Sequence, residues 1–291
     1  MATVTEWFEG ARPRTLPAAL APVIVGSGAA ASLGGFALGR ALLAAGVALA
    51  LQVGVNYAND YSDGVRGTDL SRVGPTRLTA SGIARPKHVR NAAFIAFGVA
   101  ALLGLALVLV TRQWWWLGFG VAAFWAAWFY TGGKRPYGYE GLGEVMVFIF
   151  FGLVATLGTT VTQAGRLSLA SALGAVAMGL LACALLMVNN IRDIPTDALA
   201  GKHTLAVRLG DATARRVYAG FIWLALACAF AALLPGVWAL WMLLFIAPAA
   251  VLTFAVRVGV GGRLLVPVLA GTSGFQLAMA LIVATGLALR A

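Results

Sequence analysis

Long apolar stretches recur along the whole chain, and they constrain its fold more than any other feature. A run of about 18 or more mostly apolar residues is long enough to cross the hydrocarbon core of a membrane as a helix. Only 11% of the 291 residues are charged, against about 25% in soluble domains. The sequence therefore predicts one all-α domain over residues 1–291 with nine transmembrane helices. The predicted spans are about 16–34, 41–59, 91–110, 114–131, 143–162, 169–189, 217–234, 237–256 and 264–288.

Basic residues concentrate on one side of this predicted topology. Of the 21 Lys and Arg residues, 17 fall on the side of the N-terminus and four on the other side. Cytoplasmic segments of membrane proteins carry an excess of Lys and Arg, which predicts a cytoplasmic N-terminus in a protein of the plasma membrane. The net charge of +11 is then explained by topology. The expected partner is the lipid bilayer, not nucleic acid.

Two acidic stretches each follow an apolar run. In the first, Asn56, Asp60 and Asp63 share one face of a helix, and 189–197 repeats much of this spacing. Ionised carboxylates beside hydrocarbon are costly and repel one another, and hard divalent cations relieve both costs. Mg²⁺ prefers carboxylate oxygens and often bridges to substrate phosphate, so these stretches predict a metal and diphosphate site. The predicted metal ligands are Asp60, Asp63, Asp193 and Asp197.

Basic and amide side chains near the acidic stretches fit the remaining phosphate charge. Arginine and lysine are the residues that proteins use to bind phosphate oxygens. Asn56 and Asn189 lie one turn inward from the acids and either orient a carboxylate or supply a neutral ligand. The residues predicted to bind substrate on these grounds are Asn56, Arg66, Lys134, Arg135, Asn189 and Lys202.

Three other interpretations of the acidic stretches stay open at this point. In the first interpretation the acids are ordinary solvated residues that cap helices, but two matching patterns in one chain argue against this. An ion-coupled transporter would also need acids in the membrane, but near the midplane, and the predicted span centres contain none. A CDP-alcohol phosphotransferase starts with Asp-x2-Asp-Gly, as 60–64 does. Its other acids follow in one compact motif, whereas here the partner pattern is 133 residues away.

Three motifs resemble those of the UbiA superfamily of intramembrane aromatic prenyltransferases. They are NYANDYSD at 56–63, YTGGK at 130–134 and NNIRDIPTD at 189–197. The resemblance covers essentially the whole chain. Two longer stretches, ARPRTLPAALAPVIVGSG at 11–28 and YTGGKRPYGYEGLGEVMVFIFFG at 130–152, are similar to one branch, the 1,4-dihydroxy-2-naphthoate polyprenyltransferases of menaquinone synthesis.

The resemblance implies a helix bundle around a central cavity that opens to the cytoplasm and to lipid. It implies Mg²⁺-dependent transfer of a polyprenyl group from its diphosphate to dihydroxynaphthoate, with loss of the carboxylate, giving demethylmenaquinone. Another aromatic acid, such as 4-hydroxybenzoate, stays open as the acceptor. Tyr130 and Lys134 match a Tyr-x3-Lys motif that contacts the diphosphate. The first motif often places a further acid where this chain has Gly64, which leaves the role of Asp69 open.

Other residues have expected roles beside these motifs. Tyr139 handles the acceptor or only shapes its loop, and Arg12 and Arg14 either meet an anionic substrate or set topology. An allylic cation needs a dry cavity, and aromatic faces stabilise positive charge. Four aromatic residues could line such a cavity, although packing or lipid contact is favoured for each one taken singly: Trp125, Trp128, Phe148 and Phe151. The residues expected to form an interfacial belt are Trp114, Trp115 and Trp116.

Overall fold

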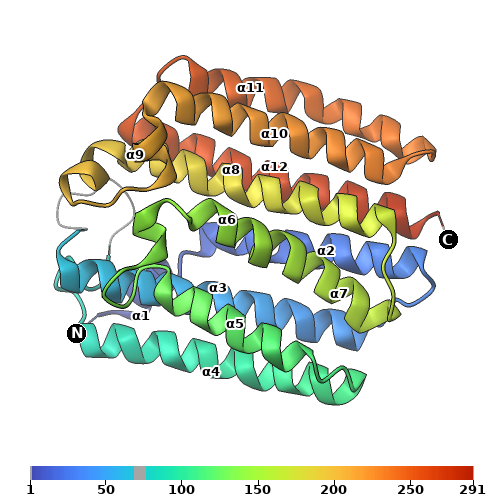
Figure 1. The fold of residues 1–291 in the computed structure, drawn as a ribbon, viewed down its shortest axis with the longest axis horizontal. Coiled ribbons are helices and arrows are strands. Elements are labelled where there is room, and N and C mark those ends of the chain that lie inside the picture. The colour runs from blue at the N-terminus through green and yellow to red at the C-terminus, as the bar shows by residue number, and fades with distance from the viewer. Residues whose placement is uncertain (1, 69–76, 291) are drawn as a thin grey trace.

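The computed structural model describes residues 2–68 and 77–290, which form a bundle of roughly parallel and antiparallel helices (Figure 1). These residues contain no β-strand. Eight helical stretches among them are long and apolar enough to cross a membrane. They are Val4–Ser32, Leu38–Arg66, Pro86–Thr111, Gly143–Ala164, Leu169–Leu199, Asp211–Leu233, Val237–Arg257 and Gly262–Ala288. The ninth predicted span is the shorter apolar helix α5 (Trp116–Phe129), so the predicted all-α fold is confirmed and the count of nine is approximate.

Both acidic stretches are the last turns of long helices. α3 (Leu38–Arg66) ends only at Gly67, which adopts the left-handed conformation that terminates helices, with φ of 77°. α8 (Leu169–Leu199) begins at Ser168, whose side chain accepts from the backbone N–H of Ser171. The predicted spans 41–59 and 169–189 end too early, because these helices continue past the apolar run. The acidic side chains are therefore held on rigid helical turns.

One membrane span changes its helical type twice along its length. It consists of α6 (Gly143–Val147), the π-helical segment η3 (Phe148–Val154) and α7 (Ala155–Ala164). Gly152 of η3 lies so close to α8 that a Cβ at this position would be 2.4 Å from the Cα of Gly179. Small residues allow such close backbone contact between helices in lipid. This contact anchors the irregular span against the centre of the bundle.

The largest buried cluster is centred on α8. It packs against α2 (Leu16–Ser32), α10 (Asp211–Leu233) and α12 (Leu265–Ala288). Among its fully buried side chains are Met178, Leu181, Tyr218, Ile222 and Met279. Large apolar side chains on α4 (Pro86–Thr111) and α11 (Ile246–Arg257) face outward instead, as expected for lipid-facing helices.

The connections that carry the charged motifs gather at one end of the bundle. Figure 1 shows α1 (Val4–Gly10), α9 (Leu205–Leu209) and the connection between α5 and α6 at this end, while the C-terminus lies at the opposite end. The α5–α6 connection includes the short 3-10 helix η2 (Tyr137–Glu140). The helices thus bring motifs that are far apart in the sequence to one end of the molecule.

Candidate active site

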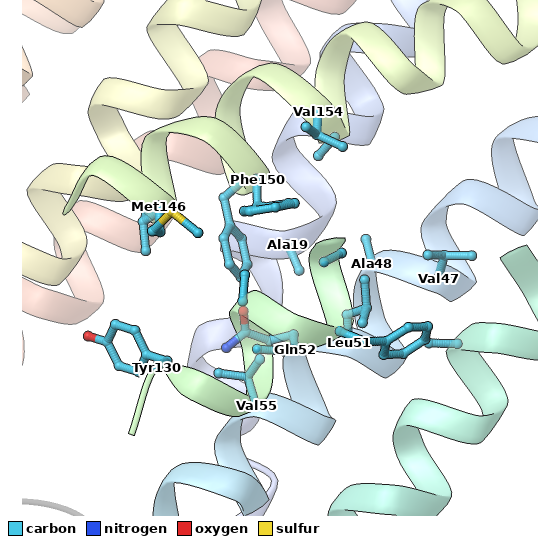
Figure 2. A pocket seen from close by; sticks show the side chains of 18 of the residues that line it. Ala19, Val47, Ala48, Leu51, Gln52, Val55, Tyr130, Met146, Phe150 and Val154 are labelled. Carbon is cyan, nitrogen blue, oxygen red and sulfur yellow. The ribbon is translucent and has the colours of Figure 1, made fainter. Parts of the chain in front are cut away.

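A cavity of about 710 Å³ lies among α2, α3, α4, α5, α8 and the span formed by α6, η3 and α7. Most of its wall is apolar. Figure 2 shows Met146 and Phe150 on one side of the cavity and Leu51 and Val55 of α3 on the other. Near the ends of α3 and α8 the wall becomes polar and charged. The polar lining residues there are Asn56, Asn59, Asp63, Arg77, Asn189, Asn190 and Lys202.

The two acidic helix ends meet at Lys202. Its Nζ lies 3.7 Å from Asp63 Oδ2 on α3 and 3.9 Å from Asp197 Oδ1 on α8. Asp63 is 1% exposed, and a nitrogen of the Arg77 guanidinium lies 4.0 Å from its Oδ2. The predicted convergence of the two motifs is therefore observed for one acid of each pair. Carboxylate and basic groups alternate at the charged end of the cavity.

Tyr139 closes this charged cluster from the α5–α6 connection. Its hydroxyl donates to Asp63 Oδ1 at 2.8 Å. Its ring lies between two cations, 5.4 Å from Arg66 and 5.1 Å from the Lys202 nitrogen. Burial, and then the charge of Asp63, raise the pKa of the Tyr139 phenol above its ordinary value. The phenol is thus kept as a hydrogen-bond donor to the carboxylate.

The other two predicted metal ligands have different partners. Asp60 accepts from the backbone N–H groups of Leu78 and Thr79, both at 2.8 Å. Asp193 accepts two hydrogen bonds from the Arg192 guanidinium, both at 2.7 Å. In residues 2–68 and 77–290, no group of three or more His, Cys, Asp or Glu side chains is placed to hold a metal ion. The four-carboxylate metal site stays a prediction, and Asp69 lies outside the described residues.

The basic residues of the Tyr-x3-Lys turn are arranged by Arg66. Its guanidinium donates to the backbone carbonyls of Thr131 and Gly133 and so fixes the turn after α5 against the end of α3. Lys134 and Arg135 are exposed on this turn, outside the set of described residues that line the cavity. Their predicted substrate contacts stay a prediction.

Asn56 links the cavity to the N-terminal segment. It is 2% exposed, and its Nδ2 donates to the Ala11 carbonyl at 2.8 Å and to Thr15 Oγ1 at 3.1 Å. Arg12 lies between these two contacts and lines the cavity. Its φ of 55° is uncommon for a residue other than glycine. Asn56 therefore holds the strained segment that brings Arg12 to the cavity, whereas Arg14 is exposed.

Asn189 and Tyr130, both predicted from their motifs, line the cavity. Asn189 Oδ1 accepts from Arg192 at 2.9 Å, so the same guanidinium binds Asn189 and Asp193. Figure 2 shows Tyr130 on the same side of the cavity as Met146. The arginine inside the second motif is thus the residue that orders it, a role that the spacing of the acids did not indicate.

Four polar residues of the site were not singled out from the sequence. Asn59 lines the cavity and accepts from Thr131 Oγ1 at 2.9 Å; its position four residues before Asp63 is a signal for a shared helix face. Arg77 lies in a loop without a recognisable pattern and is 7% exposed. Glu144 and Asn190 lie side by side on α6 and α8, and only the structure brings them together.

The four aromatic residues considered for the cavity divide between lining it and packing elsewhere. Phe151 lines the cavity, as does Trp116, which was assigned to an interfacial belt. Trp128 instead stacks on Phe94 with ring centroids 4.9 Å apart, and Phe148 packs against α8 at Gly179. Trp125 is exposed and stacks on Tyr137. Consecutive aromatic residues on a helix face different directions, and the sequence does not say which face meets the cavity.

The UbiA prenyltransferase family matches residues 19–263, most of the chain. The chain belongs to this family. A 1,4-dihydroxy-2-naphthoate octaprenyltransferase of Mycobacterium tuberculosis is 51% identical over 289 residues, which cover 99% of this chain and 98% of that protein. A protein of the same name from Escherichia coli is 42% identical over 257 residues, or 86% of this chain and 83% of that one. The predicted UbiA resemblance is confirmed.

Solved structures share the fold of this family member. A UbiA homologue from Aeropyrum pernix superposes with a TM-score of 0.71 at 17% identity, covering 96% of this chain and 98% of that chain. One from Archaeoglobus fulgidus, bound to GPP and Mg²⁺, gives 0.68 at 15% identity, covering 96% and 99%. The family match decides against the phosphotransferase and transporter alternatives and confirms a multi-pass membrane prenyltransferase.

Proposed function

We propose that this protein transfers a polyprenyl group from polyprenyl diphosphate to 1,4-dihydroxy-2-naphthoate, with loss of the carboxylate, in menaquinone biosynthesis. The observation that carries the proposal is the junction between the apolar cavity and the charged cluster of Asp63, Asp197 and Lys202. A polyprenyl diphosphate has the same division into an apolar chain and a charged head. The identity to naphthoate prenyltransferases over nearly the whole chain supports the acceptor.

The charged cluster fits both a divalent cation and a diphosphate. Asp63 and Asp197 flank the one positive charge of Lys202, so carboxylate oxygens from two helices already face a shared cation. Hard oxygen ligands of this kind suit Mg²⁺. We propose that these two acids, with Asp60 and Asp193, hold Mg²⁺, which would neutralise charge that develops on the leaving diphosphate. Lys202 and Arg77 border the same space and fit the remaining phosphate charge.

The cavity provides the dry, aromatic surroundings that the rest of the reaction needs. Its apolar wall excludes water from an allylic carbon that develops positive charge when the C1–O bond breaks. We assign the stabilisation of that charge to the aromatic rings of Tyr130 and Phe150, which line the cavity. The electron-rich naphthoate ring then attacks, and loss of a proton and CO₂ restores aromaticity. We assign Arg12 to the acceptor carboxylate, because its guanidinium lies at the cavity wall beside α2.

The charge distribution supports a cytoplasmic active site in the plasma membrane. The connections that carry the 17 basic residues include those at the charged end of the cavity. A cytoplasmic mouth admits a water-soluble aromatic acid and Mg²⁺ from the cytoplasm, while the prenyl chain enters from lipid. The exposed Lys134 and Arg135 then attract anionic substrates to this mouth.

One experiment tests the reaction directly. Purified protein is incubated with Mg²⁺, a polyprenyl diphosphate and, separately, dihydroxynaphthoate or 4-hydroxybenzoate, and the products are identified by mass. We expect a prenylated product with dihydroxynaphthoate and CO₂ release in equal amount. A product that retains its carboxylate, or transfer only to hydroxybenzoate, would move the protein to another branch of the family.

A further inference from the structure

Glu144 is a buried acid, outside the acidic motifs, that hydrogen-bonds to the cavity-lining Asn190. It lies at the start of α6 and is 4% exposed. Its Oε1 accepts from Asn190 Nδ2 on α8 at 3.1 Å, and its Oε2 has no hydrogen-bond partner among the described residues. A buried carboxylate with an unpaired oxygen is costly, and such groups in native proteins call for an explanation.

The hydrogen bond to Glu144 fixes the orientation of the Asn190 amide. In the structure the Asn190 NH₂ group donates to Glu144 Oε1, so the amide oxygen of Asn190 faces away from Glu144. Asn190 lines the cavity, and Glu144 occupies its NH₂ group. The amide oxygen is therefore the polar atom of Asn190 left to bind a group in the cavity.

The surroundings of Asn190 suit a flat hydroxylated ring. Tyr130 and Met146 line the same cavity, and Met146 lies two residues after Glu144 on α6. The Tyr130 hydroxyl lies near the start of α6, 3.4 Å from where a Cβ on Gly143 would be. Asn189 and the acid pair, by contrast, interact with Arg192 and Lys202. An aromatic and thioether wall with one hydrogen-bond acceptor matches a phenol better than it matches a metal ion.

We propose that Glu144 is a positioning residue, which orients Asn190 so that its Oδ1 accepts a hydrogen bond from a ring hydroxyl of the acceptor. The inference rests on the proposed transfer to a hydroxylated aromatic acid and adds a determinant of acceptor binding on α6 and α8. A carboxylate does this better than an amide would. The side-chain amide of a glutamine at position 144 can flip, which exchanges its oxygen and nitrogen, and the Asn190 amide could then flip with it.

The test is the steady-state kinetics of Glu144→Ala, Glu144→Gln, Glu144→Asp and Asn190→Ala with dihydroxynaphthoate. We expect the acceptor KM to rise roughly 3–10-fold in Glu144→Ala and Asn190→Ala, the size of one neutral hydrogen bond. Glu144→Gln should fall between these variants and the wild type, and Glu144→Asp should restore most of the loss. The KM for polyprenyl diphosphate and the Mg²⁺ dependence should stay within about twofold.

A double variant and a matched control separate positioning from simple packing. Glu144→Ala combined with Asn190→Ala should be no worse for acceptor KM than Asn190→Ala alone, because the two residues act as one unit. The Cys183 thiol donates to the backbone carbonyl of Glu144, with Sγ 3.1 Å from the oxygen. This bond involves neither the Glu144 carboxylate nor Asn190. Cys183→Ala should leave the acceptor KM unchanged.

The outcomes also separate this inference from the proposed function. Failure of the wild type to prenylate dihydroxynaphthoate overturns the proposed function. Normal wild-type transfer with an unchanged acceptor KM in Asn190→Ala overturns this inference alone, as does a raised Mg²⁺ requirement, which would make Asn190 a metal ligand. If Glu144→Ala does not fold, the acceptor KM values of Glu144→Gln and Asn190→Ala still test the inference. A naphthoate analogue lacking one hydroxyl should inhibit the wild type and Asn190→Ala equally if that hydroxyl is the group bound.

Discussion

Asp60 and Asp63 lie three residues apart on α3 but bind different parts of the protein. The Asp60 carboxylate accepts two backbone N–H groups from the segment that begins at residue 77, and the Asp63 carboxylate lines the cavity beside Lys202. Both side chains are 1% exposed. One acid of the first motif therefore holds the backbone beside the site, and the next one lines the cavity.

Because Asp60 and Asp63 have different partners, we expect substitution of Asp63 to lower mainly activity and substitution of Asp60 to lower both activity and stability. Asp63→Asn should lower prenyl transfer at least about 100-fold, because its charge is needed for the cation and diphosphate, with a small change in thermal stability. Asp60→Asn should also lower transfer, but it should cost about 1.5–3 kcal/mol of stability. The new NH₂ group would face the N–H donors of Leu78 or Thr79. Activity and thermal unfolding measured on both variants check this.

Glu140→Gln is a matched control for that comparison, since Glu140 is an exposed acid whose partner, Arg208, is also exposed. It should change neither quantity appreciably, because exposed ion pairs contribute little. Equal stability loss in the two Asp variants would contradict the division of roles, and near-normal transfer by Asp63→Asn would contradict the site.

Lys202 and Lys134 should differ in their effect on diphosphate binding. Lys202 lies between two acids at the cavity wall, so Lys202→Met should raise the KM for polyprenyl diphosphate about tenfold or more. Lys134 is exposed on the turn held by Arg66, so Lys134→Ala should raise that KM only a few-fold and leave turnover at high substrate. KM is measured at low and at about 0.5 M salt. Salt should abolish the Lys134 effect and retain the Lys202 effect; the reverse pattern would exchange their roles.

The sequence predicted the membrane fold and the two acidic helix ends because both depend on local patterns. Long apolar runs define spans, and carboxylates at their ends mark a polar rim. The pattern did not predict which acid of each pair faces the cavity. That depends on the partner each carboxylate takes in the fold: the distant backbone at residue 78 for Asp60, and the neighbouring Arg192 side chain for Asp193.

Contacts between residues of separate helices have no signal in the sequence. Glu144 and Asn190 are 46 residues apart and meet only because α6 packs on α8. The π-helical geometry of η3, which contributes Phe150 and Phe151 to the cavity, has no signal in the apolar run at 143–162. Trp116, expected in an interfacial belt, lines the cavity instead, since the face that an aromatic residue presents is set by packing.

The raised pKa of Tyr139 predicts a stability change at alkaline pH. Burial and Asp63 keep the phenol protonated in the folded state, whereas the unfolded chain loses this proton near its ordinary pKa of about 10. The folded state then binds more protons, so Tyr139 contributes stability below about pH 10 that is lost as pH rises further. Thermal stability between about pH 9 and 11 should fall less steeply in Tyr139→Phe than in the wild type. Identical slopes would mean that the phenol is not held by Asp63.

The orientation of the bundle in the membrane can be tested directly by cysteine labelling. The 17 to 4 distribution of Lys and Arg predicts that the charged end of the cavity faces the cytoplasm. Ser81 and Leu199 are exposed at that end, and Leu167, also exposed, lies in the connection between α7 and α8 at the other. Single cysteines at these positions, in a chain with Cys183 and Cys228 replaced, are treated with a membrane-impermeant maleimide. Leu167→Cys should react in intact cells, whereas Ser81→Cys and Leu199→Cys should react only after the membrane is opened. Strong labelling of the latter two in intact cells would reverse the orientation and place the acceptor site outside.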